Sequence, residues 1–450
     1  MEFKINQENI EEIKDLISSG SDDILVEKFK EIHYADIAEI MEELSVSEAK
    51  YIFDLLDSEK TAETLLELDE DIRIKILNQL SPLEIAEELD ELSTDDAADL
   101  IAELPFDKKQ EVIARIQDTE HAKDIVDLLR YDEDTAGGLM AKELIKVNEN
   151  WTVLTCVKEM RKQAKDVKRV HSIYVVDDDN VLKGRLSLKD LLTTSTRTPI
   201  REIYIPKVDF VYVDTKDVEV ARLMQKYDLE AIPVLDELGR LLGRVTIYDI
   251  VDVIKEDADK NYQLAAGISQ DVEADDNLID QTKARLPWLL LALLGGFVAV
   301  KVSGNFEAAM EQYRVLFFFT PLIAAMAGNV GVQSSAIIVQ GLANNTLTGS
   351  LLKRLFKELS LSILNGLLLA IFLLIGSFFL LQIDLLVAVT VAIALITVIV
   401  IASLIGTFVP FTLNKYGIDP ALATGPFITT SNDIFGILIY FTIAKIILGF

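Results

Sequence analysis

The sequence predicts a multidomain membrane protein with an all-α superhelical N-terminal domain, an α/β domain that contains a tandem repeat, a connecting helix and a five-helix α transmembrane domain. Three observations predict this fold class. The last third of the chain consists of long apolar runs, residues 32–116 repeat every 12 residues, and residues 139–255 contain a second repeat with an offset of 59. We expect domains at residues 1–130, 131–255 and 286–450, joined by a connecting helix or linker at 256–285.

Charge divides the 450-residue chain at the same place. Residues 1–285 carry a net charge of −31 and residues 286–450 a net charge of +1, which together give −30. Phosphate recognition depends on clustered Lys and Arg, so we expect no nucleic-acid partner. The single cysteine, Cys156, excludes a disulfide scaffold, and the first residues lack an apolar signal core. We therefore expect the acidic body to lie in the cytosol.

Five apolar runs are long enough to cross a bilayer, which takes about 20 residues in a helix. We predict membrane helices at residues 286–305, 315–344, 359–382, 385–413 and 420–449. Lys353, Arg354 and Lys357 lie between helices two and three, and Lys415 lies between helices four and five. Since Lys and Arg favour cytosolic loops, we expect a multi-pass protein of the cell membrane with cytosolic N-terminal domains and an outer C-terminus.

The second and fifth runs contain polar residues that lipid-facing helices exclude. The second includes Pro321, residues 328–331 (GNVG) and residues 333–335 (QSS), and the fifth runs from DPALATGP to Asp433. Polar groups inside a membrane must bond to protein or to a water-filled path, so we expect these two helices to line a wet path. The alternative is that the small residues only allow close helix packing.

Asp433 lies 14 residues after Asp419, about 20 Å along a helix at 1.5 Å per residue. Lys445 follows 12 residues later, about 18 Å further on and too far for a direct ion pair. An unpaired acid deep in a membrane indicates a cation path. The alternative is a protonated Asp433 that only holds two helices together.

The ligand types in these spans favour a hard cation. The spans contain no Cys or His, which disfavours zinc and copper. Oxygen ligands suit Mg²⁺ and Ca²⁺. One Asp per chain, or two facing each other in a dimer, fits hydrated Mg²⁺ better than the roughly six to eight oxygens of Ca²⁺.

Leucine carries the 12-residue repeat. The repeated residues are Leu44, Leu56, Leu68, Leu80, Leu92 and Leu104, and the helix-start residues that follow them are Ser45, Asp57, Asp69, Ser81, Ser93 and Pro105. The pattern predicts short helices stacked into a superhelix. One of these starts, residues 93–99 (STDDAAD), concentrates carboxylates that either complement the helix dipole or bind a metal ion.

The second repeat pairs residues 172–177 (SIYVVD) with 231–236 (AIPVLD), and residues 184–190 (GRLSLKD) with 243–249 (GRVTIYD). This region resembles a tandem pair of CBS domains. The resemblance implies nucleotide contacts, with ATP as the cofactor, from Ser187 and Asp190 in the first repeat and from Thr246 and Asp249 in the second. A CBS pair without a nucleotide is the alternative, because fold does not determine function.

Over essentially its whole length, the chain resembles the MgtE-type magnesium transporters. Residues 131–140 (YDEDTAGGLM), 321–335 and 419–433 (DPALATGPFITTSND) carry this resemblance, together with their order relative to the CBS pair and the five spans. It implies a homodimeric Mg²⁺ channel in a lipid bilayer, with its pore on the dimer axis between spans two and five.

The resemblance also implies the roles of individual residues. Asp433 would hold hydrated Mg²⁺ in the pore. The remaining pore-lining residues would be Asn329, Gln333, Gly425, Pro426, Thr429 and Asn432. Cytosolic Mg²⁺ would be sensed by Asp95, Asp99, Asp228, Asp249 and Asp257. The sequence departs from the family pattern at Lys260-Asn261, where further acids are expected, and at Gln340, where an Arg often ends span two.

Self-repulsion of the acidic body suggests how such a channel is gated. A divalent ion that bridges carboxylates of different domains removes the repulsion, and we expect it to favour the closed state. One rival class is a proton- or ion-coupled secondary transporter of another divalent cation, Co²⁺, Mn²⁺ or Ni²⁺. A membrane enzyme or a pure sensor is disfavoured, because the sequence has no nucleophile–base set, HExxH motif or phosphate loop and does have an Asp-bearing span.

Overall fold

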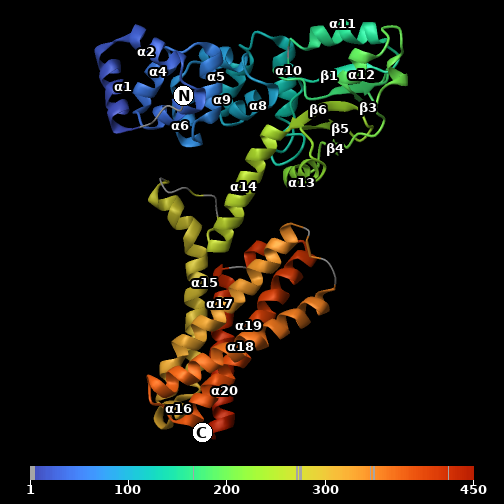
Figure 1. Cartoon of the computed structure of the whole chain (residues 1–450). Coiled ribbons are helices and arrows are strands. Elements are labelled where there is room, and N and C mark those ends of the chain that lie inside the picture. The colour runs from blue at the N-terminus through green and yellow to red at the C-terminus, as the bar shows by residue number, and fades with distance from the viewer. Residues whose placement is uncertain are drawn as a thin grey trace. The chain divides into compact units, whose positions relative to one another are not determined.

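The computed structural model describes residues 6–165, 167–269, 272, 276–344, 346–347, 350–423 and 425–450. The chain divides into two compact units, Met1–Lys255 and Glu256–Phe450. Short helices and small sheets build the first unit, and long helices build the second (Figure 1). The fold class predicted from the sequence is confirmed in each unit.

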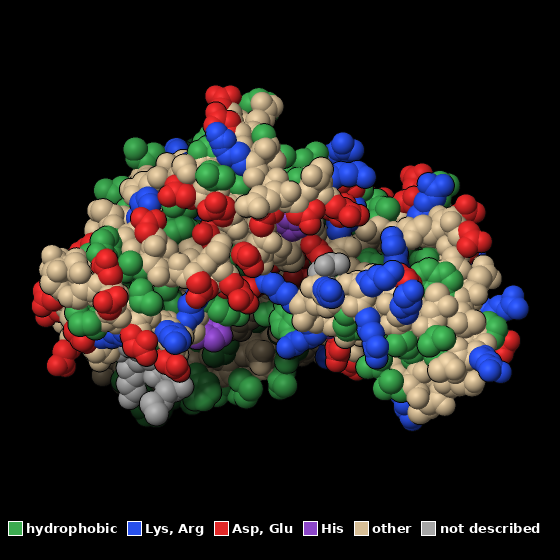
Figure 2. Space-filling model, turned by 90° about the horizontal axis from the view of Figure 1, so that it is seen from above, with side chains coloured by type: hydrophobic (Ala, Val, Ile, Leu, Met, Phe, Trp, Pro, Cys, Tyr) green, Lys and Arg blue, Asp and Glu red, His purple; other side chains and the backbone are tan. Residues whose placement is uncertain are grey.

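Short helices fill the first unit up to residue 128. The helices are α1 (Gln7–Ser19), α2 (Asp22–Lys30), α3 (Tyr34–Glu42), α4 (Val46–Phe53), α5 (Ser58–Glu67), α6 (Glu70–Gln79), α7 (Pro82–Leu89), α8 (Thr94–Ala102), α9 (Phe106–Ile113) and α10 (Thr119–Leu128). Figure 2 shows acidic side chains over much of the face that it presents, while Lys and Arg gather most densely toward the right of the view. This is the distribution of solvated surface charges.

The 12-residue repeat determines where these helices begin. The residue after each repeated leucine is the N-cap of helices α4 to α9, as the sequence predicts. Ser45 with Glu48 and Ser81 with Glu84 form capping boxes, in which each side chain bonds to the backbone N–H of the other. These caps satisfy N–H groups that a helix start otherwise leaves unpaired.

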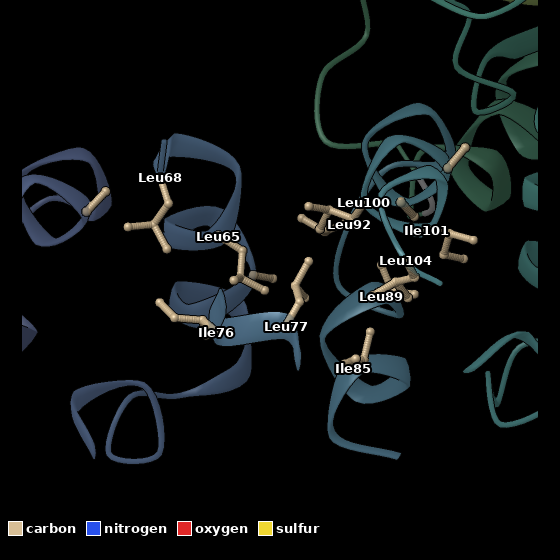
Figure 3. Packing of buried hydrophobic residues seen from close by; sticks show 14 of the residues in the cluster. Leu65, Leu68, Ile76, Leu77, Ile85, Leu89, Leu92, Leu100, Ile101 and Leu104 are labelled. Carbon is tan, nitrogen blue, oxygen red and sulfur yellow. The ribbon is translucent and has the colours of Figure 1, made fainter. Parts of the chain in front are cut away.

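Helices two apart in the chain pack on one another, which stacks the repeats into a superhelix. Helix α3 packs on α5, α5 on α7 and α7 on α9, while α4 packs on α6 and α8 on α10. Leu68, Leu80, Leu92 and Leu104 are all buried in the shared core, part of which is shown in Figure 3. One leucine per repeat therefore supplies a continuous apolar interior.

Two small sheets follow, each with two parallel strands and one antiparallel strand. Their elements are β1 (Ile145–Asn148), α11 (Val153–Gln163), β2 (Ile173–Val176), β3 (Leu182–Leu186), α12 (Leu188–Thr193), the 3₁₀ turn at Ile200–Glu202, β4 (Val211–Tyr212), α13 (Asp217–Tyr227), β5 (Ala231–Leu235) and β6 (Leu241–Thr246). Strand orders are β1-β2-β3 and β4-β5-β6. Ile173 pairs with Leu186, and Ile232 pairs with Val245 at the predicted offset of 59.

The two sheets are joined symmetrically. The N–H of Leu182 donates to the carbonyl of Gly239, and the N–H of Leu241 donates to the carbonyl of Asn180. The two bonds are related by the same offset, so the duplication extends to the contact between the repeats.

Helix α14 (Ile247–Ala266) leaves the second sheet and ends at Gly267, whose φ is +79°. The expected connector at 256–285 covers the end of α14 and the start of the next helix, and its residues 270, 271 and 273–275 lie outside the described residues.

Five helices of the described chain are long and apolar enough to span a membrane. They are α15 (Leu278–Gly304), α17 (Val315–Ala343), α18 (Leu351–Phe379), α19 (Leu385–Lys415) and α20 (Gly425–Leu448), with the shorter α16 (Glu307–Gln312) and a 3₁₀ turn at Pro420–Ala423 between them. Helices α15 and α18 begin earlier than predicted, because uncharged runs mark the hydrocarbon layer whereas the helices continue into charged residues. Helix α20 begins later, because Gly425 has φ +55° after the 3₁₀ turn.

A buried acid in the N-terminal domain makes its stability depend on pH. Glu88 is 9% exposed and accepts a hydrogen bond from Ser58 Oγ at 3.1 Å. Burial raises the pKa of Glu88 to about 7 from 4.5. Because the folded state binds this proton more tightly than the unfolded chain does, the stabilisation is complete below pH 4.5 and is lost as pH rises through about 7.

We predict that Glu88→Gln stabilises the N-terminal domain above pH 7 by ~1–3 kcal/mol, since the amide keeps a neutral acceptor for Ser58. Hydrogen exchange of the α7 amides between pH 5 and about 8 measures this difference. Glu87→Gln, at the exposed neighbouring position, serves as the control. An equal effect of the two substitutions, or a benefit of Glu88→Gln that shrinks with rising pH, would contradict the assignment.

Candidate cation-binding sites

The start of helix α8 is fixed against the segment that leads into the first sheet. Glu143 accepts hydrogen bonds from the backbone N–H of Thr94 at 3.0 Å and from its hydroxyl at 2.8 Å. Lys142 donates its own N–H to the Thr94 hydroxyl at 2.9 Å and its ammonium group to Asp127 at 2.7 Å. These bonds hold the acids that follow Thr94 in a defined position.

Four carboxylates of the first unit act on one another electrostatically, and they form the acidic cluster: Asp95, Asp96, Asp99 and Asp249. Burial, followed by the charge of Asp95, raises the pKa values of Asp96 and Asp249 above their usual range. Desolvation by the surrounding protein atoms is the main cause that raises the pKa of Asp99 to about 8, and the charges of Asp95 and Asp96 come next. The Asp99 side chain nevertheless remains exposed. A divalent cation placed among these groups would relieve this repulsion.

The acidic cluster of a single chain is not arranged as a metal-binding site. Within the described residues of one chain, no three His, Cys, Asp or Glu side chains stand close enough together to hold a metal ion. Asp228, which ends α13 with φ +50°, is exposed, and no hydrogen bond or ion pair within the described residues joins it to these acids. Asp257 lies in the second unit, where Asn261 Nδ2 donates to its carboxylate at 3.0 Å and to its carbonyl at 2.7 Å. Asn261 occupies a position where the family resemblance predicts another acid, and here it stabilises Asp257 through these two bonds.

The repeated element GxxSxxD or GxxTxxD has a structural role in both CBS-like repeats. A Cβ atom at Gly243 would lie 2.6 Å from the carbonyl oxygen of Ala141, so only glycine fits there. Thr246 precedes α14, and both its N–H and its hydroxyl donate to the Asp249 carboxylate, at 2.8 and 3.0 Å. In the first repeat Ser187 is the N-cap of α12 and accepts the N–H of Asp190 at 3.4 Å. Both bonds go to one oxygen of the Asp249 carboxylate, Oδ2, which leaves Oδ1 able to bind another ligand.

In the membrane unit, glycines of α17 bring that helix against α20. A Cβ atom at Gly328 would lie 3.2 Å from Cγ2 of Thr429 and 3.8 Å from Oδ1 of Asp433. Asp433 is half-buried, and no described residue forms a hydrogen bond or ion pair with its side chain. It lies eight residues into α20, about 12 Å along the helix. This depth is smaller than the sequence-based 20 Å because the helix starts only at Gly425.

One turn further along α17, three helices meet at Gly331. A Cβ atom there would overlap the amide nitrogen of Asn432, and a Cβ atom at Gly406 of α19 would collide with the Gly331 carbonyl. Asn432 is 1% exposed, and neither atom of its amide has a hydrogen-bond partner among the described residues. Asn432 therefore lies inside the helix bundle, next to Asp433 but turned away from any exposed surface of a single chain.

The other predicted polar residues of α17 lie on its outer side. Asn329 and Gln333 are one helical turn apart and both are exposed in a single chain. Exposed amides are unfavourable in lipid, so this stripe must face water or a second protein surface. Thr429 lies near Gly328 together with Asp433, which places Thr429 and Asp433 beside the α17 helix that carries the stripe.

Gly425 and Pro426 lie at a junction with α14 instead of alongside Gly328. A Cβ atom at Gly425 would collide with the carbonyl oxygen of Ala265, and one at Gly267 would collide with the Pro426 ring. Both glycines have positive φ, +55° and +79°, which favours glycine independently of the contact. The end of α14 therefore touches the start of α20.

Sequence reasoning did not identify Glu143 or Gly331 as contributors to these sites. Glu143 acts through a contact between distant segments, which no local spacing reveals. Small residues in apolar spans often mark close contacts between helices. Gly328 and Gly331, together with Gly406 in a later helix, are the signal in this sequence for the contact described above.

Family models match three parts of the chain. Residues 320–443 match the MgtE family, described as divalent cation transporters, and residues 32–134 match the MgtE intracellular N domain. Residues 136–196 and 200–256 match the CBS domain.

Individual proteins are similar over much of the chain. The magnesium transporter MgtE of Thermus thermophilus is 35% identical over 441 residues, which are 97% of this chain and 98% of the relative. The magnesium transporter MgtE of Bacillus subtilis is 33% identical over 328 residues, 73% of this chain and 72% of the relative. A structure of the cytosolic domain of the Mg²⁺ channel MgtE in complex with ATP has a TM-score of 0.51 and 38% identity, and the match covers 54% of this chain and 98% of that one.

The three-helix contact predicts the effect of one added methyl group. Gly331→Ala should destabilise the membrane unit by ~1–3 kcal/mol, the usual cost of overpacking, and should lower its unfolding temperature in detergent. Gly296→Ala is the matched control, since a Cβ atom at Gly296 of α15 meets nothing within 4 Å. Equal unfolding temperatures for the two variants would show that α17 does not pack as closely as described.

Proposed function

The chain belongs to the MgtE family of divalent cation transporters, and on that premise we propose that it is a homodimeric channel whose pore lies between α17 and α20 and closes when cytosolic Mg²⁺ binds. It is a multi-pass membrane protein with a cytosolic N-terminal domain, and it transports Mg²⁺. Because the number of spans is odd, a chain that starts in the cytosol would have its C-terminus on the outer side of the cell membrane. Conduction is the whole proposed activity, with no catalytic step.

Asp433 is the observation that carries the pore proposal. Its carboxylate lies inside a membrane helix, has no partner among the described residues and stands beside Gly328 of α17. An intramembrane acid without a partner is costly unless a cation or water meets it. Mg²⁺ keeps most of its waters and binds few carboxylates directly, so one Asp from each copy can hold the hydrated ion.

The outer stripe of α17 supports a dimer. Asn329 and Gln333 are exposed on the single chain although α17 lies in the membrane. A second copy that places the same stripe opposite this one would enclose a polar path and remove these amides from lipid. Thr429 and Asp433 would border the same path.

Mg²⁺ sensing is proposed for Asp95, Asp99 and Asp249, with Asp228 and Asp257 added when domains of one or two chains come together. The raised pKa of Asp99 reports an electrostatic cost that bound Mg²⁺ would lower. One chain does not arrange these acids as a metal-binding site within its described residues. A compact state that brings acids of different domains together would therefore bind Mg²⁺ more tightly than the open state. Such a difference in affinity is what gating by a ligand requires.

The contact between the end of α14 and the start of α20 supplies a route to the pore. Ala265 and Gly267 touch Gly425 and Pro426, at the start of the helix that bears Asp433. A shift of α14 would therefore press directly on α20. Both glycines would lose this close fit if they gained a side chain.

ATP binding is proposed at the first CBS repeat. The solved MgtE cytosolic domain with ATP is similar to this chain, and Ser187 and Asp190 carry the nucleotide element of that repeat. No described group donates to the Asp190 carboxylate, whereas Thr246 already donates twice to that of Asp249. This difference favours Ser187 and Asp190 over Thr246 and Asp249 as nucleotide ligands.

A secondary transporter of Co²⁺, Mn²⁺ or Ni²⁺ coupled to protons is the alternative. It would use Asp433 as a proton carrier as well as a cation ligand. Dependence of uptake on a proton gradient distinguishes it from a channel.

We predict that Asp433→Asn lowers Mg²⁺ flux into proteoliposomes by about tenfold or more, the factor that corresponds to losing one charge-assisted contact. Asp384→Asn is the matched control, since Asp384 caps α19 by accepting the N–H of Leu386 at 2.9 Å and Asn also serves as an N-cap. Flux at the wild-type rate through a correctly inserted Asp433→Asn protein would rule out Asp433 as the pore ligand.

Neutralising Asp95, Asp99 and Asp249 together, each to Asn, should raise the Mg²⁺ concentration that half-inhibits flux by about tenfold or more, because ligand loss outweighs relief of screened repulsion. The control replaces three exposed acids of the N-terminal domain, Glu27, Glu39 and Glu111, by Gln and removes the same charge. If both triple variants respond to Mg²⁺ alike, total charge and not this cluster sets the response.

A further inference from the structure

A chain of polar side chains crosses three helices of the membrane unit. Ser334 Oγ of α17 donates to Glu358 Oε1 of α18 at 2.6 Å. Ser362 Oγ, one turn along α18, bonds to the Glu358 carbonyl at 2.6 Å and also forms a hydrogen bond with Ser403 of α19. Ser334, Ser362 and Ser403 are 5%, 2% and 0% exposed, so these bonds lie inside the bundle.

The Ser334–Glu358 bond joins two helices that otherwise meet mainly through a third. Helices α17 and α18 each pack extensively on α19, while direct backbone proximity between α17 and α18 is slight. A hydrogen bond to a charged acceptor is stronger than one between neutral groups, and the donor Ser334 is buried, although Glu358 is only half-buried. This bond is therefore a specific constraint on α17, at a residue about 100° around the helix from Gln333.

The packing of α17 and the Ser334–Glu358 bond together determine its rotation. At its contacts with α19 and α20 the helix presents Gly328 and Gly331, where the helices approach closely, and the bond adds a directional constraint one turn further along. Ser334 follows Gln333 directly, and successive residues of a helix point about 100° apart. When Ser334 bonds to Glu358, Gln333 is held on the exposed side.

We propose that Glu358 is a positioning residue for conduction: by holding Ser334 it sets the rotation of α17, which directs Asn329 and Gln333 toward the permeating cation. This inference rests on the proposed pore and adds the element that orients its wall. It requires an acceptor at position 358 and does not require a negative charge there. A direct cation ligand would require the charge, which separates the two roles.

The test uses the single native cysteine of the chain. In a Cys156→Ala background, Gln333→Cys is introduced, and its reaction rate with a charged, membrane-impermeant methanethiosulfonate reagent is measured in proteoliposomes. Ser334→Ala and Glu358→Ala should each slow this reaction by about tenfold, the factor expected for losing a hydrogen bond to a charged group, and the two together should slow it no further. Glu358→Gln, which keeps an acceptor oxygen, should leave the rate within about twofold of the background.

Mg²⁺ flux through the same variants with Gln333 intact should fall with Ser334→Ala and Glu358→Ala and be retained with Glu358→Gln. Ser360→Ala, an exposed serine of α18, is the control and should change neither reading. Loss of flux in Glu358→Gln equal to that in Glu358→Ala would overturn the positioning role in favour of a charge role.

The thiol introduced by Gln333→Cys separates this inference from the proposed pore. If that thiol reacts in the background and its rate is unaffected by Ser334→Ala and Glu358→Ala, the inference alone is overturned. If the thiol does not react in the background, the proposed pore is overturned, and the inference with it.

Discussion

The close approach of α17 to α19 and α20 at Gly331 is the contact on which the membrane unit depends. No side chain fits between Gly331, Gly406 and the amide of Asn432, so α17 and α19 meet nearly backbone to backbone and the Asn432 side chain of α20 packs on Gly331. One turn away, the same approach brings Gly328 to the side of Asp433. Close packing by small residues and a polar path are thus compatible here, because the glycines that let helices touch also leave the polar stripe of α17 on the outside.

The cytosolic unit follows the opposite principle, since it keeps like charges together at an energetic cost. Burial and the charge of Asp95 raise the pKa values of Asp96, Asp99 and Asp249, and the hydrogen bonds of Thr94 to Glu143 hold Asp95 in position. Strain of this kind is useful to a sensor, because an ion that removes it binds one arrangement better than another. The end of α14 at Gly425 offers a mechanical link, since it touches the helix that carries Asp433.

Much of the fold follows from local sequence patterns. The N-caps every 12 residues, the offset of 59 between the sheets and the five apolar spans all depend on residues near one another in the chain, and the structure has them. The predicted ends of the membrane helices are less accurate, because charged residues mark the membrane boundary and not the helix boundary. Asn432, predicted to line the pore, is buried against Gly331, and the pairing of Ser334 with Glu358 was not foreseen. Both depend on how helices are rotated against one another, which periodicity alone leaves open.

We propose that an acidic cytosolic body closes a passive Mg²⁺ pore when it binds the ion that the pore conducts. Purified protein in proteoliposomes of defined orientation, loaded with a fluorescent Mg²⁺ indicator and held without a proton gradient, tests it most directly. We expect Mg²⁺ to enter down its own gradient when the cytosolic face is free of Mg²⁺, and that entry to fall steeply once millimolar Mg²⁺ is supplied to that face. Entry that needs a proton gradient, or that is indifferent to cytosolic Mg²⁺, would contradict it.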